Sequence, residues 1–163
     1  GAADPNSPSA LECERGLAAA IQNAGLAERV HRHGRQPQEA IRELLNGADV
    51  FVAPYVETAT GDKDGIPTAI LEAMATGLPI LATDAGSIPE IVDSGAEGWL
   101  VPQNEPAAFA AQLVALALEP ELLLVAGREA RRRFEQEFDV RVTEAKLHDR
   151  VRALLIRQLR EFG

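Results

Sequence analysis

Apolar positions follow two patterns along the first two thirds of the chain, and these patterns alternate. In the first, apolar residues recur at helical spacing and the segment ends at or near a glycine, which predicts the helices Ser9–Ala24, Pro37–Gly47, Pro67–Gly77 and Pro89–Gly95. In the second, short apolar or mixed runs predict strands at Val30–His33, Val50–Ala53, Pro79–Ala82 and Gly98–Val101. Continuous apolar runs suit strands buried on both faces. The alternation therefore predicts an α/β fold with a doubly wound parallel sheet.

From Asn104 onward the pattern predicts helices alone. These are Asn104–Leu118, with Asn104 as its cap, Glu121–Phe138 and Val140–Phe162. The last helix has an apolar stripe formed by Leu147, Val151, Leu154 and Leu155, and it carries the basic residues Arg150, Arg152, Arg157 and Arg160. We therefore expect an α/β domain over residues 1–138 and an amphipathic C-terminal helix over residues 139–163.

Composition narrows the class of protein. The 163 residues are 46% apolar and 25% charged, which is typical of one soluble globular domain. No apolar stretch reaches the roughly 20 residues that a membrane span needs. The single cysteine, Cys13, has no partner within the chain for a disulfide, and no signal peptide is visible, so we expect a cytoplasmic location.

Charge is unevenly distributed. The chain has 16 basic and 25 acidic residues, a net charge of −9, which argues against nucleic acid as a partner. Residues 128–163 nevertheless hold 10 basic against 7 acidic residues. Within this part Arg131, Arg132 and Arg133 are expected to form the solvated face of a helix, with Glu135 as an ion-pair partner; a weak contact with an anionic membrane surface is the alternative.

A polar loop follows the predicted strand Val50–Ala53 and leads into the helix that begins at Pro67. Ligands of α/β sheets bind beyond the carboxyl ends of the strands, so this loop is placed to form a site. Backbone amides near the helix start have no helical partner, and the helix dipole favours an anion there. Those amides belong to Gly65, Ile66, Thr68 and Ala69.

Two carboxylates flank the helix start. Asp64 precedes it and Glu72 lies in its second turn, which would put them ~12 Å apart along a continuous helix. That separation is too wide for a shared metal ion, and it suits the two ends of a long ligand. On spacing alone, however, an ordinary turn residue and a solvated helix residue explain the pair better. Asp62 and Asp64 form an Asp-x-Asp pair without a further ligand at calcium-loop spacing, so we predict no metal site.

Several linked motifs between about Gly25 and Phe138 carry a resemblance to a known family. They are Gly61–Pro67, Leu71–Ile80, Ile88–Val92 and Gly98–Pro102, joined by His33–Arg35 and Ala48–Val52. In this order they resemble the group 1 (family 4) glycosyltransferases, and the Gly-Ile-Pro variant of the motif is similar to that of exopolysaccharide members. Asp64 stands where most members have Glu, Ile66–Pro67 replaces a Phe-Gly type of sequence, and Gly86–Ser87 departs from the usual Gly-Gly or Ser-Gly.

The resemblance implies a GT-B enzyme, in which two Rossmann-like domains enclose a cleft and the C-terminal one binds a nucleoside diphosphate sugar. Residues 1–138 would be this donor-binding domain without its first strand–helix unit. The sugar would pass to a glycan or lipid-linked acceptor held by an absent N-terminal domain, with retention of configuration and with neither metal nor other cofactor. We expect the 163 residues alone to be inactive. The resemblance also implies a cytoplasmic protein, with the inner face of the membrane as one site of action.

The same resemblance implies roles for individual residues. Asp64 would approach the donor sugar and Glu72 would accept hydrogen bonds from the ribose hydroxyls, so both count as catalytic candidates. The amides of Gly65 and Ile66, with Thr68 beside them, would hold the sugar or the diphosphate. The loop of Gly34, Arg35 and Gln36 would lie near the base. Two alternatives remain: a module that binds nucleotide or nucleotide sugar without catalysis, and a nucleotide-sugar epimerase of the same fold.

Overall fold

The computed structural model describes residues 7–57 and 67–161, which fall into two compact units, Gly1–Glu43 and Leu44–Gly163. In the first unit, helix α1 spans Pro8–Asn23, and the Ser7 side chain caps it by accepting a hydrogen bond from the Ala10 N–H. Gly25 follows in the left-handed conformation (φ +65°), which ends the helix. Helix α2, Gln38–Asn46, begins in the first unit and ends in the second.

The prediction of a strand at Val30–His33 is wrong. Residues 30–33 form no strand, and all four are exposed. Arg32 of this segment forms an ion pair with Glu14 of α1. A strand exists only where a neighbour supplies hydrogen bonds, and no segment in the described parts of the chain pairs with this one.

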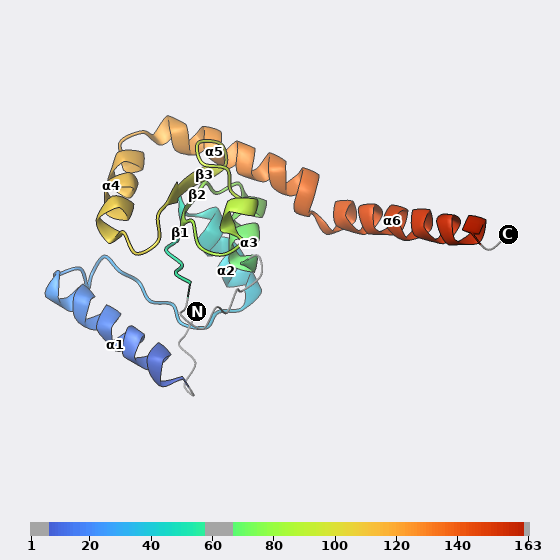
Figure 1. The fold of residues 1–163 in the computed structure, drawn as a ribbon. Coiled ribbons are helices and arrows are strands. Elements are labelled where there is room, and N and C mark those ends of the chain that lie inside the picture. The colour runs from blue at the N-terminus through green and yellow to red at the C-terminus, as the bar shows by residue number, and fades with distance from the viewer. Residues whose placement is uncertain (1–6, 58–66, 162–163) are drawn as a thin grey trace. The chain divides into compact units, whose positions relative to one another are not determined.

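Three parallel strands form the sheet of the second unit (Figure 1). They are β1 (Phe51–Ala53), β2 (Ile80–Thr83) and β3 (Gly98–Val101), in the order β1-β2-β3. Leu81 of β2 pairs with Val52 on one side and with Trp99 on the other. Helix α3 (Thr68–Thr76) connects β1 to β2, and a short 3₁₀ turn, η1 (Ile88–Glu90), lies between β2 and β3. The predicted strands at Val50–Ala53, Pro79–Ala82 and Gly98–Val101 are confirmed to within a residue.

Both faces of the sheet are covered, as the doubly wound prediction requires. Ile80 and Ala82 of β2 point to the face packed by α3, where Ile70 and Met74 are fully buried. Leu81, between them in sequence, points to the other face. There it packs with Leu116 of α4. The alternation along β2 is the period of two that a strand imposes, here apolar in both directions.

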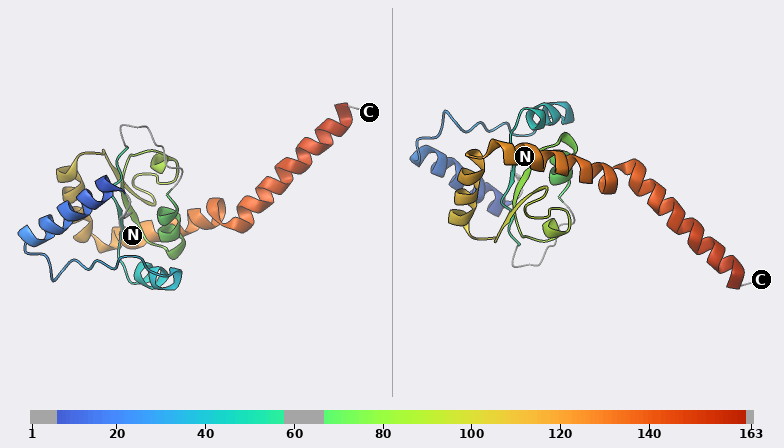
Figure 2. Two further views of the ribbon diagram at one scale, coloured as in Figure 1. Left: turned by 90° about the horizontal axis from the view of Figure 1, so that it is seen from below. Right: turned by 90° about the horizontal axis from the view of Figure 1, so that it is seen from above.

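The C-terminal helices follow in the predicted order, and α4 and α5 lie against the sheet while α6 extends away from it (Figures 1 and 2). They are α4 (Pro106–Ala117), α5 (Pro120–Arg133) with a π-helical continuation, η2 (Phe134–Phe138), and α6 (Val140–Glu161). The apolar stripe predicted on α6 exists and is exposed, at Leu147, Val151, Leu154 and Leu155.

Two details of the predicted helices are wrong. Pro89–Gly95 forms only the single turn η1, because Ile88, Ile91 and Val92 bury themselves under the sheet and Ser94 then bridges to Gly98. Asn104 does not cap α4, since it adopts a left-handed conformation (φ +63°) and Glu105 takes the capping position without a side-chain hydrogen bond.

The arginine run at 131–133 is a solvated face only in part. Arg131 pairs with Glu135 at 2.7 Å and Arg132 pairs with Glu129 at 2.7 Å, both at the surface. The Arg133 side chain is instead only 13% exposed. The expectation of three solvated arginines is therefore wrong for Arg133, because the helix turns this residue toward the loop that precedes β3.

Arg133 is the centre of a partly buried ion-pair cluster. Its Nη1 atom lies 3.1 Å from Asp93 and 3.3 Å from Glu97, and Glu97 is itself 4% exposed. The Arg133 Nη2 atom also donates to the carbonyl oxygen of Glu90 at 3.1 Å. Burial alone would lower the pKa of Arg133, but the carboxylates of Glu97, Asp93 and Glu137 more than offset this and raise it. The cluster fastens the end of α5 to the connection between β2 and β3.

Within the described ranges, no single helix is both long and apolar enough to cross a membrane. Helix α4 and the stretch Pro120–Leu155 meet the length and composition criteria only as a pair, bent by 101°.

Candidate functional site

The start of α3 lies at the carboxyl edge of the sheet. The helix follows β1 in sequence and runs back to the amino end of β2, so its first turn is at the edge where β1 ends. Pro67 is its N-cap residue, with extended backbone (φ −63°, ψ 114°), and the Ile70 N–H donates to the Pro67 carbonyl oxygen at 3.0 Å. Helical geometry leaves the N–H groups of Thr68 and Ala69 without a partner inside the helix. This confirms the helix start predicted from Pro67, and Gly77 ends the helix as predicted.

Thr68 and Glu72 occupy the same face of α3. They are four residues apart, which places their Cβ atoms about 5–6 Å from one another in a helix. Thr68 is exposed and Glu72 is half-buried. The opposite face carries the core residues Ile70, Ala73 and Met74. Packing of that face against the sheet therefore fixes which way Thr68 and Glu72 point.

The remaining predicted site residues lie either in the other compact unit or outside the described residues. Gly34, Arg35 and Gln36 belong to the first compact unit, where Gly34 adopts φ +66° and the Gln36 side chain donates to the carbonyl of His33. Asp64, Gly65 and Ile66 lie outside the described residues. Their roles stay predictions.

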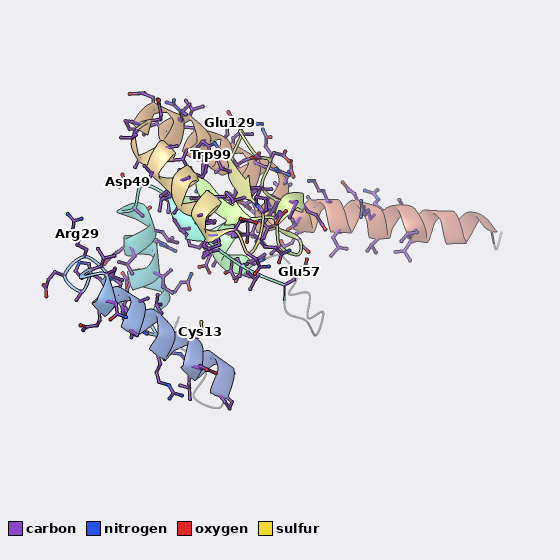
Figure 3. The ribbon with its side chains drawn as sticks, turned by 60° about the vertical axis from the view of Figure 1, so that its left-hand side comes forward. Cys13, Arg29, Asp49, Glu57, Trp99 and Glu129 are labelled. Carbon is purple, nitrogen blue, oxygen red and sulfur yellow. The ribbon has the colours of Figure 1, made fainter. Side chains whose placement is uncertain are left out.

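The sequence motifs did not identify a set of hydrogen bonds that links the loops after all three strands. Glu57 follows β1, and Figure 3 shows it at the opposite end of that strand from Asp49. The Glu57 Oε1 atom accepts from the Gly86 N–H at 2.9 Å, and the Glu57 N–H donates to Gln103 Oε1 at 2.9 Å. Thr83, buried at the end of β2, donates through its hydroxyl to the Tyr55 carbonyl. The sequence offers a signal for these hydrogen bonds, because Glu57, Thr83 and Gln103 each stand at or shortly after the end of a strand.

The described residues contain no group of three or more His, Cys, Asp or Glu side chains that could hold a metal ion. Asp62 and Asp64 fall outside them. A surface groove lies elsewhere, at the amino edge of the sheet, between Asp49 and Pro79 on one side and Leu123 and Arg128 of α5 on the other. Thr68 and Glu72, the predicted site residues that the structure describes in this unit, do not line the groove.

Comparison with known proteins gives the site its context. Residues 6–119 match the family model for glycosyl transferases group 1. The chain belongs to the group 1 glycosyltransferases. It is 37% identical over 142 residues to WcaL of Escherichia coli (strain K12), a candidate colanic acid biosynthesis glycosyltransferase, and the match covers 86% of this chain and 35% of WcaL. It is 35% identical over 136 residues to the amylovoran biosynthesis glycosyltransferase AmsK of Erwinia amylovora, with 83% and 33% covered. The resemblance to exopolysaccharide glycosyltransferases is thereby confirmed.

Solved structures with the same fold confirm the predicted architecture. The C-terminal domain of the group 1 family protein LpcC from Francisella tularensis superposes with a TM-score of 0.68 at 22% identity, covering 82% of this chain and 66% of that domain. HepE of Anabaena, solved with UDP and glucose, gives a TM-score of 0.75 at 23% identity over 88% of this chain and 37% of HepE. The group 1 chain thus has the architecture of a GT-B C-terminal domain. It spans about a third of the length of the curated relatives it matches.

Proposed function

We propose that this group 1 glycosyltransferase chain is a donor-binding domain, which binds a nucleoside diphosphate sugar at the carboxyl edge of its sheet. The observation that carries the proposal is the position of α3. Its first turn presents the Thr68 and Ala69 amides at this edge, and Glu72 lies one turn later on the same face as Thr68. Amides suit phosphate oxygens, and a carboxylate suits ribose hydroxyls.

Different residues are then assigned to the different parts of the donor. Glu72 accepts hydrogen bonds from the ribose hydroxyls, while Thr68 and the amides at the start of α3 face the diphosphate. Asp64, with the amides of Gly65 and Ile66, meets the donor sugar. Gly34, Arg35 and Gln36 border the base. These assignments extend the family pattern to the positions of this sequence that match it.

The proposed reaction transfers the sugar to a glycan or a lipid-linked acceptor with retention of configuration. The bond between the anomeric carbon and the diphosphate oxygen breaks, and negative charge accumulates on the departing diphosphate. Amides that are already oriented at the start of α3 stabilise that charge without rearranging. The names of the relatives support a glycan product, because WcaL and AmsK are both named for polysaccharide biosynthesis.

Nucleotide complexes of structural neighbours support the choice of ligand. HepE has been solved with UDP, with UDP-glucose, and with UDP and glucose, and TarM of S. aureus has been solved with UDP. We propose a nucleotide sugar as the ligand of this chain because the fold is shared and because the start of α3 offers amides to a phosphate.

Calorimetric titration with nucleotides tests the proposal. The chain is titrated with UDP, GDP, UDP-glucose and GDP-glucose, and the titration is repeated with Glu72→Ala and with Glu144→Ala. Glu144 is an exposed carboxylate on α6, so it controls for the change in net charge. We expect Glu72→Ala to weaken binding roughly tenfold, as the loss of hydrogen bonds to a charged group does, and Glu144→Ala to leave it unchanged. Absence of binding up to millimolar nucleotide would contradict the proposal.

The cellular setting belongs to the same proposal. A lipid-linked acceptor would place the protein in the cytoplasm at the inner face of the membrane, with weak contact through the basic C-terminal part. Arg131 and Arg132 remain exposed there although each has an acidic partner. Binding to anionic vesicles that falls with rising salt supports this setting, and no binding at low salt ends it.

A further inference from the structure

The outer face of helix α5 exposes apolar side chains. The helix packs onto the second unit through three small buried residues, Ala126, Gly127 and Ala130. On the other side the exposed fraction is 60% for Leu124 and 51% for Val125, and Leu118 and Leu122 at the turn from α4 are exposed as well. Seen from above, α5 lies in front of the sheet (Figure 2). Adjacent exposed apolar side chains of this kind are typical of a surface that binds another molecule.

Two charged residues of opposite sign flank the apolar pair. Glu121, Leu124, Val125 and Arg128 follow the spacing i, i+3, i+4, i+7, which places all four on one face of the helix. Glu121 and Arg128 are both exposed. Within the described parts of the chain neither of them forms an ion pair. The outer face therefore has an acid at one end, a base at the other, and apolar side chains between them.

This order of residues is complementary to itself. The midpoint between Leu124 and Val125 is also the midpoint between Glu121 and Arg128, and it lies about 5 Å along the helix axis from each of the two charged residues. A two-fold axis at that midpoint pairs two copies of α5 in antiparallel orientation. Glu121 of each copy then lies opposite Arg128 of the other, and Leu124 lies opposite Val125. A parallel pair would instead bring like charges together.

We propose that the outer face of α5 is the interface of a homodimer, in which a second copy of this chain packs antiparallel across a two-fold axis. The inference goes beyond the proposed function and does not depend on nucleotide binding. Burial of Leu124 and Val125 supplies affinity, and the exposed Leu118 and Leu122 extend the apolar area. The two pairs of Glu121 with Arg128 set the orientation and the register.

Helix α6 also exposes an apolar stripe, but that stripe is not complementary to itself. Arg150 adjoins the stripe at its middle, between Leu147 and Leu154. An antiparallel pair of α6 helices would bring the two copies of Arg150 close together, and like charges at an interface oppose association. A second copy therefore suits α5 and does not suit α6. Leu147, which is 63% exposed, provides a matched control for Val125.

Sedimentation equilibrium of the 163-residue chain, over a range of micromolar concentrations, tests the proposal. We expect the parent chain to reach twice the 17.5 kDa mass of one copy. Val125→Asp should raise the dissociation constant of the dimer roughly a hundredfold, because it buries a carboxylate against Leu124 of the other copy. Leu147→Asp makes a similar change on α6 and should leave the constant unaltered. Far-UV circular dichroism identical to that of the parent shows that each variant is folded.

Charge reversal tests the register of the two helices. Glu121→Lys places a lysine opposite Arg128, and Arg128→Glu places a carboxylate opposite Glu121. Each single change should raise the dissociation constant roughly tenfold. The double variant exchanges the two charges and keeps the net charge of the chain, so it should recover the dissociation constant of the parent. A double variant no tighter than the single ones would show that these residues do not face each other in the dimer.

Three results would overturn the proposal. One is a chain that stays monomeric at every concentration. Another is a dimer that survives Val125→Asp, or one that Leu147→Asp dissociates, since the interface would then lie elsewhere. The third is association into ever larger species, which a closed two-fold interface does not form. In each case the proposed function stands or falls separately, because the nucleotide titrations involve none of these residues.

Discussion

Gly127 of α5 lies directly against the carbonyl oxygen of Gly77, the residue that ends α3. A Cβ atom on Gly127 would come within 2.3 Å of that oxygen, and within 3.4 Å of the Pro79 ring. Gly77 itself has φ +79°, so a glycine is favoured on this side of the contact as well. The approach of two backbones lets α5 pack on α3 and fixes the far end of the helix that carries Glu72.

We expect Gly127→Ala to lower the free energy of unfolding by about 2 kcal/mol, since the added methyl group must push α5 away from α3. Urea denaturation followed by the fluorescence of Trp99, the one tryptophan of the chain, measures the change. Gly16→Ala in α1 is the control, because a methyl group at that position would meet no atom beyond its own stretch of helix within 4 Å. Unchanged stability in Gly127→Ala would show that the two helices are not in close contact.

Arg133→Ala should destabilise the second unit by about 3 kcal/mol, because it leaves the Glu97 carboxylate buried without its cation. The double variant Arg133→Ala with Glu97→Gln should be more stable than Arg133→Ala alone, since the uncompensated charge is gone while the Asp93 N–H keeps an oxygen to bond. Urea denaturation again provides the measurement. A double variant as unstable as the sum of its two single changes would contradict this account of the cluster.

Asp139 caps the start of α6 and gives that helix a pH dependence. Its carboxylate accepts from the Arg141 side chain and from the Arg141 N–H at 2.9 Å, and these bonds lower its pKa from 3.8 to about 2. The stabilising contribution is complete above pH 3.8 and is lost as the pH falls through about 2. The Asp139 carboxyl carbon, followed by NMR, should titrate near the lower value, and Arg141→Ala should move the midpoint upward. A midpoint near 3.8 in the parent chain would show that Arg141 does not hold the carboxylate.

Much of the sheet can be predicted from the sequence because its strands are short apolar runs, and the central strand β2 is buried along its whole length. Gly98–Val101 is predicted residue for residue, since an apolar run between glycine and proline signals has few alternatives. Val30–His33 is a mixed run with one apolar residue, and it forms no strand. Whether a segment becomes a strand depends on pairing with a neighbouring strand, and local composition does not reveal such a neighbour.

The short turn η1 shows the same limit for helices. Residues 89–95 have helical spacing, but Asp93 donates its N–H to Glu97 and Ser94 bridges to Gly98, so the backbone leaves the helix. Glu97, which accepts the Asp93 N–H, also forms an ion pair with Arg133, 36 residues further on. A local pattern cannot reveal a partner at that distance.

Part of the candidate site can likewise be predicted from local sequence signals, and part of it cannot. The helix start at Thr68 and the position of Glu72 follow from Pro67, Gly77 and the spacing of apolar residues, which are all local signals. The bonds of Glu57 to Gly86 and Gln103 span 29 and 46 residues and involve one backbone group each. Only the parallel order of the strands, which brings their carboxyl ends together, makes these neighbours visible.

The most direct test of the central claim is an NMR titration of the ¹⁵N-labelled chain with UDP and with GDP, following every backbone amide. If the donor binds at the start of α3, one of the two nucleotides shifts the amides of Thr68, Ala69 and Glu72 in a saturable way, and Glu72→Ala reduces these shifts at the same nucleotide concentration. Shifts confined to the groove residues Leu123 and Arg128, or no shift at millimolar nucleotide, would contradict a donor site at the start of α3.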